Sequence, residues 1–237
     1  MVVASWHISS KNREKLQKSL EKAADKQKRD AELLETLPRR EISFKGHSLP
    51  ATPWMPYECV RYKLTDFKGN IDRRTLYSLN WKFGGSHARN KQGETSEKLD
   101  ALFDEWIEHA GFNNWIQPMG IMGVFPCQSD GEEVVVYDPE DTSKELARFR
   151  FDVVIGAGKK DTISCAQYFK PKDLGEFDAV GLQISTSGPH VDPHINRFRE
   201  DGDSESCLYL QGLSDRIAED MADHLHDKLR KHMGFEN

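Results

Sequence analysis

GVFPCQSDGEEVVVYDPED, residues 123–141, is the stretch that decides the fold. Its beginning belongs to the apolar run MGIMGVFP, which is typical of a buried strand. Asp130 and Gly131 then form a turn signal, and the β-branched run of Val134, Val135 and Val136 favours a second strand. The stretch therefore predicts two strands that follow each other across a turn.

More strands are predicted on both sides of this stretch. They cover residues 57–64, 146–154, 163–169 and 177–186. Helical periodicity instead marks residues 97–110, after a cap at Thr95 or Ser96 and before a helix end at Gly111. Adjacent strands with helices before and after them predict an α+β domain around a mostly antiparallel sheet.

The last predicted element is a long helix that starts near Ser206 or Ser214 and ends at Met233, with Gly234 just beyond it. Its core-facing stripe repeats every four residues and consists of Leu213, Ile217, Met221, Leu225 and Leu229. Asp215, Glu219 and Asp223 lie on another face as like-charge pairs at i, i+4. Two interpretations of that acidic face stay open: a solvated surface, or a cleft that accepts a cationic ligand.

A charged helix is predicted near the N-terminus, over residues 9–37, with Ser9 or Ser10 as its cap. Its apolar stripe is thin, so we interpret it as an arm or linker rather than a core element. The irregular, proline-marked stretch 48–56 follows it. We therefore expect residues 1–50 to form a helical arm and residues 51–237 to form the main domain.

Composition excludes several classes of protein. The net charge of -6 argues against general binding of nucleic-acid backbones. No apolar run approaches the ~20 residues of a membrane span, and the N-terminus does not resemble a signal peptide, so we expect a cytoplasmic protein. The four widely spaced cysteines fit reduced thiols rather than a disulfide framework or a zinc site.

Familiar catalytic and metal-binding motifs are absent from the sequence. GAGKK, residues 156–160, lacks the first glycine and the final Ser or Thr of a phosphate-binding loop. His190 and His194 have the spacing of helical metal ligands, but Pro189 and Pro193 bracket them, so we expect a polar loop there. We assign no catalytic residue and no metal ligand to this chain.

Segments in one order carry a resemblance to a known family. They are residues 70–85 (NIDRRTLYSLNWKFGG), residues 123–141, residues 168–188 (YFKPKDLGEFDAVGLQISTSG) and residues 213–235 (LSDRIAEDMADHLHDKLRKHMGF). Together they resemble the activation (S-adenosylmethionine-binding) domain of cobalamin-dependent methionine synthase, over about residues 57–235. Compared with that family, Arg73 replaces a tryptophan, and one extra residue precedes Trp81.

The resemblance implies a C-shaped α+β fold with a twisted antiparallel sheet. It also implies a role in restoring inert cob(II)alamin by reductive methylation, with S-adenosylmethionine as methyl donor and a flavodoxin-type partner as electron donor. We expect the chain to act in trans on the cobalamin of a separate methyltransferase subunit and not to catalyse methionine synthesis alone. The alternatives are a binding module that docks on a corrinoid protein without S-adenosylmethionine, and a truncated gene product.

The resemblance implies two ligand contacts, Asp72 and Glu219. We expect these carboxylates to face a shared hollow, where they pair with an ammonium group or bridge hydroxyls. In the family, an Arg-x-x-x-Gly-Tyr segment follows the last helix and adds further contacts, and it is missing before Asn237. Because charge-assisted hydrogen bonds contribute about 1.5–3 kcal/mol each, we expect weakened affinity.

Overall fold

The computed structural model describes residues 10–49, 54–84 and 96–235, which divide into two compact units. Unit 1 comprises residues 1–47, 127–136 and 146–178, and unit 2 comprises residues 48–126, 137–145 and 179–237. The predicted division at residue 50 stays a prediction, as does the C-shaped outline.

Unit 1 combines the predicted arm with small strands. Its elements are α1 (Ser10–Thr36), β3 (Glu133–Tyr137), β4 (Glu145–Arg150), β5 (Val154–Ile155), β6 (Thr162–Ile163), η3 (Cys165–Tyr168) and η4 (Lys172–Leu174). Residues 127–130 pair antiparallel with β3, from Cys127 opposite Val136 to Asp130 opposite Glu133. Gly131 has a φ of +65° in the turn between them. The strand–turn–strand prediction for residues 123–141 is therefore confirmed.

The long charged helix at the start of unit 1 is also confirmed. Helix α1 begins at Ser10, whereas Ser9 lies outside the described residues. Leu16 and Leu20 on its thin apolar stripe are 52% and 62% exposed. Beyond the helix, the guanidinium of Arg40 makes two hydrogen bonds of 2.9 Å to the carboxylate of Asp161. The helix itself therefore buries little, and the segment after it is fixed by an ion pair.

The strand predicted over residues 163–169 is wrong. Strand β6 ends at Ile163, and the 3-10 helix η3 follows at once. The Ser164 hydroxyl accepts from the backbone N–H of Ala166, and the Gln167 side chain accepts from the backbone N–H of Ser164. This capping box satisfies the backbone groups locally, so it competes successfully with strand pairing.

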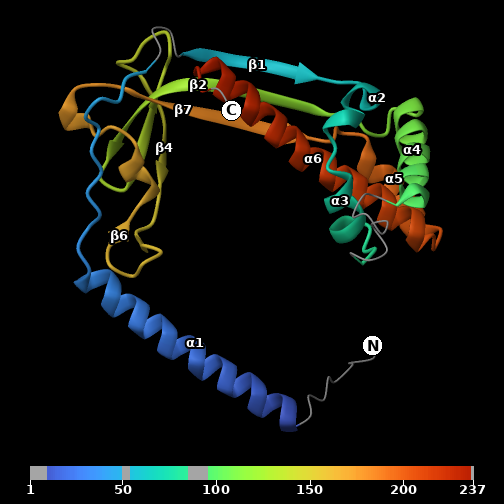
Figure 1. The fold of residues 1–237 in the computed structure, drawn as a ribbon, viewed down its shortest axis with the longest axis horizontal. Coiled ribbons are helices and arrows are strands. Elements are labelled where there is room, and N and C mark those ends of the chain that lie inside the picture. Colours follow the sequence, from blue (N-terminus) through green and yellow to red (C-terminus); the bar gives the residue numbers. More distant parts are fainter. Residues whose placement is uncertain (1–9, 50–53, 85–95, 236–237) are drawn as a thin grey trace, which may run out of the picture. The chain divides into compact units, whose positions relative to one another are not determined.

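Unit 2 holds most of the helices and the rest of the sheet (Figure 1). Its elements are β1 (Met55–Arg61), α2 (Leu64–Phe67), η1 (Lys68–Asn70), α3 (Arg73–Thr75), η2 (Leu76–Asn80), α4 (Glu97–Phe112), β2 (Met119–Asp130), β7 (Asp178–Thr186), α5 (Val191–Glu200) and α6 (Ser204–His232). Strand β2 pairs antiparallel with β1, from Arg61 opposite Met119 to Met55 opposite Val124, and it also pairs with β7. These pairings and the helices beside them confirm the predicted α+β class.

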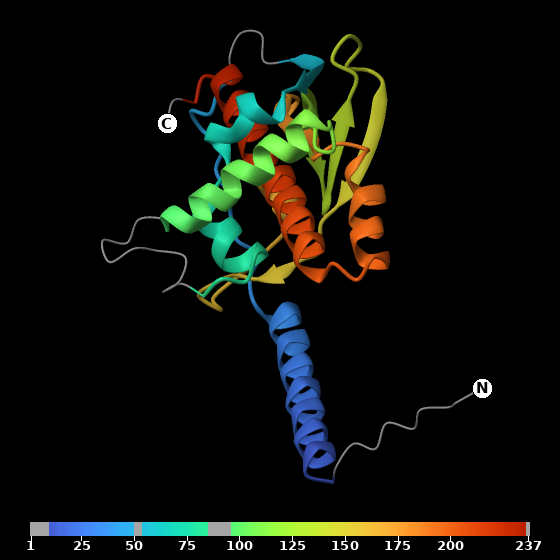
Figure 2. The ribbon, with the colours of Figure 1, turned by 90° about the vertical axis from the view of Figure 1, so that its right-hand side faces the viewer.

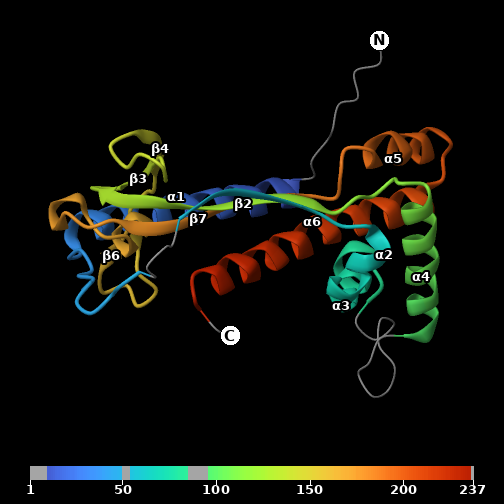
Figure 3. The same ribbon diagram turned by 90° about the horizontal axis from the view of Figure 1, so that it is seen from above.

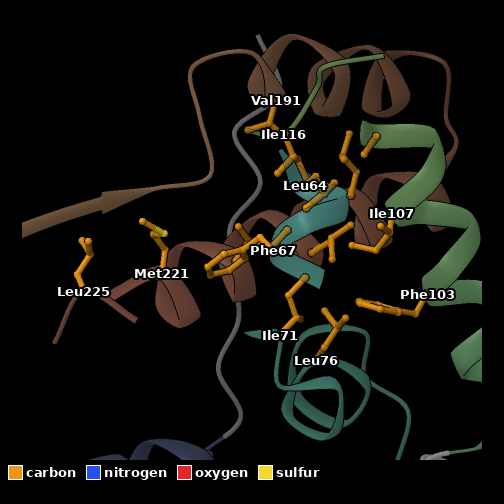
Figure 4. Packing of buried hydrophobic residues seen from close by; sticks show 14 of the residues in the cluster. Leu64, Phe67, Ile71, Leu76, Phe103, Ile107, Ile116, Val191, Met221 and Leu225 are labelled. Carbon is orange, nitrogen blue, oxygen red and sulfur yellow. The ribbon is translucent and has the colours of Figure 1, made fainter. Parts of the chain in front are cut away.

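Helix α6 packs its apolar stripe into the core of unit 2. Its predicted core residues are all buried and are 0% to 6% exposed: Leu213, Ile217, Met221, Leu225 and Leu229. The helix runs along β1, β2 and β7, and helices α2 to α5 gather around its first half (Figure 3). Side chains from these elements converge on that half in the core (Figure 4). The periodicity thus predicted the helix face correctly.

The sheet and α6 approach each other closely at a glycine. A Cβ built on Gly120 of β2 would lie 2.5 Å from the Cδ1 atom of Leu225. A larger residue at position 120 would therefore push the helix away from the strand.

The end of helix α4 differs from the prediction, whereas its start agrees with it. Helix α4 starts after Ser96, with Thr95 outside the described residues, and it passes through Gly111 to end at Phe112. Asn114, rather than a glycine, takes the left-handed conformation that follows, with a φ of 52°.

The polar loop expected around His190 and His194 is wrong as well, because α5 begins at Val191. Pro193 lies in the first turn of that helix, where the missing N–H of proline leaves no intrahelical bond unmade. Similarly, α6 begins at Ser204, ahead of both predicted starts, because the carboxylate of Asp203 accepts from the backbone N–H of Ser206.

A π-helical turn, η2, precedes Trp81. The backbone N–H of Trp81 donates to the carbonyl of Leu76, five residues earlier, over 2.8 Å. Trp81 is 2% exposed, and its indole N–H donates to the carbonyl of Tyr209 in α6. The wide turn thus ends at a tryptophan that is anchored to α6.

All four cysteines carry free thiols. Among the described residues, no helix is both long and apolar enough to cross a lipid bilayer. The cytoplasmic location stays a prediction.

We predict that Gly212→Ala destabilises unit 2. A Cβ at this position would lie 2.8 Å from the Cδ1 atom of the buried Trp81 ring. Overpacking costs about 1–3 kcal/mol, and the better helix propensity of alanine offsets roughly 1 kcal/mol of that cost. Urea denaturation should show a lower free energy of unfolding for Gly212→Ala. Gly69→Ala is the control, because a Cβ there meets nothing within 4 Å. Equal stability of the two variants would contradict the close contact.

Candidate functional site

The first predicted site residue, Asp72, caps α3. One of its carboxylate oxygens accepts from the backbone N–H groups of Arg74 and Thr75, over 3.0 and 3.1 Å. The other oxygen accepts from the Thr75 hydroxyl over 2.6 Å. The bond from the Thr75 hydroxyl, supported by the backbone bonds, lowers the pKa of Asp72 below its ordinary value. Asp72 is therefore ionised at neutral pH and fixed in one rotamer.

Asp220 connects this cap to α6, which Figure 2 shows obliquely, from the end where the helix begins. The backbone N–H of Asp72 donates to a carboxylate oxygen of Asp220 over 2.9 Å. Asp220 is 5% exposed, and burial raises its pKa above the ordinary value. A buried carboxylate of this kind requires a partner that carries positive charge.

Arg216 is that partner and also holds the second predicted site residue. Its guanidinium lies 2.7 Å from the carboxylate of Asp220 and 2.8 Å from that of Glu219. The side chain of Arg216 is 9% exposed, whereas that of Glu219 is 63% exposed. Asp72, Arg216, Glu219 and Asp220 thus form one connected set, which we call the Arg216 network.

The structure therefore brings the two predicted acids into one network, through two residues that the prediction missed. Arg216 precedes Glu219 and Asp220 by three and four positions, so all three lie on neighbouring parts of the helix surface. That spacing is the signal that could have found them. Of the like-charge pair Asp215 and Glu219, Glu219 is paired with Arg216. Asp215 accepts a hydrogen bond from the Gln211 side chain over 2.8 Å.

The charges of the Arg216 network favour a cationic ligand. The set holds three carboxyl groups and one guanidinium, of which Glu219 and Asp220 contact the guanidinium, and Asp72 stays ionised because of its hydrogen bonds. The Nε atom of Arg216 is buried and has no hydrogen-bond partner among the described residues. Glu219 and Asp72 are the exposed acids of the set, so a ligand would reach the network through their carboxylates.

A hollow shared by Asp72 and Glu219 stays a prediction. Surface hollows of about 740, 460 and 400 Å³ in unit 2 are lined by other residues, mainly from α2, α4, α5 and the start of α6. In the described ranges, no three His, Cys, Asp or Glu residues are grouped to hold a metal ion. His194 instead stacks on Trp115 with ring centroids 4.4 Å apart, and His224 shares a 2.8 Å hydrogen bond with the Tyr62 hydroxyl.

The chain is similar to known proteins in its sequence and in its fold. A family model for the activation domain of vitamin B12 dependent methionine synthase matches residues 63–237. The fold is similar to a crystal structure of the MetH reactivation domain bound to AdoHcy, with a TM-score of 0.71. That comparison has 20% sequence identity and covers 85% of this chain and 67% of the other. At this identity, the likeness concerns the fold alone.

We predict that Asp220→Ala strongly destabilises unit 2. The substitution removes the main partner of the buried Arg216 guanidinium and leaves the N–H of Asp72 without its acceptor. Breaking a buried ion pair in this way costs about 3 kcal/mol, measurable by urea denaturation. Asp223→Ala removes an exposed acid from the same helix and should change the free energy of unfolding by less than about 0.5 kcal/mol. Similar losses in both variants would contradict a structural role for Asp220.

We also predict a pH-dependent effect of Asp72→Asn, which preserves a capping side chain but removes the charge. The folded pKa of Asp72 lies below the ordinary value of 3.8. The ionised group therefore stabilises the fold above that ordinary value, and this contribution is lost as pH falls through the folded pKa. The free energy of unfolding, measured from about pH 3 to about pH 7, should favour the wild type increasingly up to about pH 5 and then level off. A difference that does not change with pH would contradict this assignment.

Proposed function

Since the chain belongs to the vitamin B12 dependent methionine synthase activation-domain family, we propose that it supports S-adenosylmethionine-dependent reductive methylation of cob(II)alamin. It would act in trans on the corrinoid of a separate methyltransferase subunit, with a flavodoxin-type protein as electron donor. S-adenosylmethionine supplies the methyl group in this chemistry. The residues of this chain bind that ligand, orient it and present it to the partner.

The Arg216 network is the observation that supports ligand binding most directly. Glu219 presents an exposed carboxylate whose position is set by the buried Arg216. An α-ammonium group or a sulfonium would be attracted to that carboxylate, and ribose hydroxyls could donate to it. The N–H at Nε of Arg216 lacks an acceptor among the described residues but is covered by protein, so a ligand would contact the exposed carboxylate of Glu219 instead. The residues present therefore fit an amino-acid nucleoside.

Asp72 has a more indirect part in this proposal. Both of its oxygens accept from α3, so its carboxylate is held in place before any ligand arrives. We assign it a contribution to the negative potential around the network, in addition to its capping role. A ligand hydroxyl could still donate to an oxygen that already accepts one bond, because a carboxylate has about four acceptor sites.

The same observation favours a second candidate function. If the local bonds of Asp72 and the ion pair of Glu219 satisfy both acids fully, the network is purely structural. The chain would then be a module that docks on a corrinoid protein without binding S-adenosylmethionine.

Isothermal titration with S-adenosylmethionine tests the first function. We expect saturable binding to the full chain, and a Kd raised at least about tenfold in Glu219→Gln, because one charge-assisted bond is lost. Asp223→Asn, which changes an exposed acid of α6, should keep the wild-type Kd.

The second candidate makes a different prediction for the same titration. No heat with S-adenosylmethionine, alone or in the presence of a cobalamin-loaded methyltransferase subunit, would contradict the first function. A heat on mixing the chain with that subunit would then support the docking module.

A further inference from the structure

The smallest of the three hollows named above is lined by none of the residues of the Arg216 network. It measures about 400 Å³ and is formed by α4, α5 and the first turns of α6, which lie side by side in Figures 1 and 3. Its principal lining residues are Glu105, Trp106, Phe198, Glu205 and Tyr209. Tyr209 and Arg216 are seven residues apart on α6, which is roughly 10 Å along a helix.

Aromatic rings form the walls of this hollow. Trp106 meets Phe198 with centroids 6.3 Å apart at 76°, and it meets Tyr209 at 6.0 Å and 68°. The Trp106 ring therefore stands at a steep angle to both the Phe198 ring and the Tyr209 ring. All three side chains are only partly buried, so each keeps some exposed surface that a ligand could contact.

The wall formed by Tyr209 is rigid. Phe83 stacks on its ring at 6.2 Å and 19°, and Trp81 packs against it at 5.1 Å. Its hydroxyl donates to the carboxylate of Glu205 over 2.8 Å. A preorganised wall loses little conformational entropy when a ligand binds.

The rim of the hollow is acidic. Glu105 and Glu205 are both exposed, and the described residues that line the hollow include His109 but no lysine or arginine. Ring faces and carboxylates both attract cations, so the two features favour the same kind of ligand.

At another place on helix α4, an aromatic ring and a carboxylate already contact an arginine side chain. The guanidinium of Arg73 lies over the ring of Phe103, 4.6 Å from its centroid, and 3.2 Å from the carboxylate of Asp100. An aromatic face beside a carboxylate of α4 therefore binds a guanidinium within this same unit.

We infer that the hollow receives the guanidinium of an arginine side chain from a partner protein. A guanidinium is planar, so it can stack on Trp106 or Tyr209 while its N–H groups donate to the carboxylate of Glu105. An ammonium lacks the planar face and is more strongly hydrated, so these rings suit it less well. This inference is independent of S-adenosylmethionine binding.

The test uses N-acetyl-arginine amide as the probe and the indole N–H resonance of Trp106 in the full chain as the readout. We expect a saturable shift of that resonance, and a Kd raised at least about threefold in Glu105→Gln. Glu108→Gln is the matched control, because Glu108 is an exposed acid on the same helix that lines other hollows. Its Kd should match that of the wild type.

Several results would overturn the inference. They are the absence of a saturable shift, equal weakening by both glutamate substitutions, and an equal response to the neutral N-acetyl-citrulline amide. Tighter binding of tetramethylammonium than of the arginine probe would overturn it too, since the hollow would then select a quaternary ammonium. Both glutamates are exposed, so the variants should keep the dispersed amide spectrum of the folded chain.

Discussion

The burial of one face of α6 is the constraint on which unit 2 depends. Leu213, Ile217 and Met221 are fully buried, and Gly120 lets Leu225 approach the sheet. Because side chains on a helix have fixed angular positions, burying this stripe also fixes the direction of every other side chain of α6. The directions in which Arg216 and Glu219 leave the helix therefore follow from apolar packing, and their ion pair then sets the position of the Glu219 carboxylate.

Ion pairs then fix the charged side chains whose directions from the helix are set by packing. Arg216 would be costly to bury alone, and Asp220 would be costly to bury without it. Their pairing leaves Glu219 exposed and held on one side by the guanidinium. Asp72 joins through its backbone N–H, so the start of α3 and the middle of α6 are connected by a short series of hydrogen bonds. Helix capping and ion pairing thus act together at one place.

Regular periodicity made much of this fold predictable from sequence. The stripe of α6, helix α4 and the strands on either side of Gly131 were all predicted correctly because repeated side chains determine them. Residues 163–169 were not, because the hydrogen bonds of Ser164 and Gln167 compete with pairing and leave no periodic trace. A proline in a first turn similarly concealed α5.

Periodicity also treats charged residues of a helix as solvated. Burial of Arg216 and Asp220 is decided by segments that pack from elsewhere, so it could not be seen in the local pattern.

The π-helical turn before Trp81 has a consequence for how the chain accommodates a change of length. The resemblance implies one more residue before Trp81 than the family pattern has. In a regular α-helix, one added residue would rotate everything after it by roughly 100°. The hydrogen bond from Trp81 to Leu76, which spans five residues, would take up such a residue within a single turn. Trp81 would then keep its contacts with Gly212 and Tyr209, so the insertion would not be transmitted to the aromatic contacts against α6.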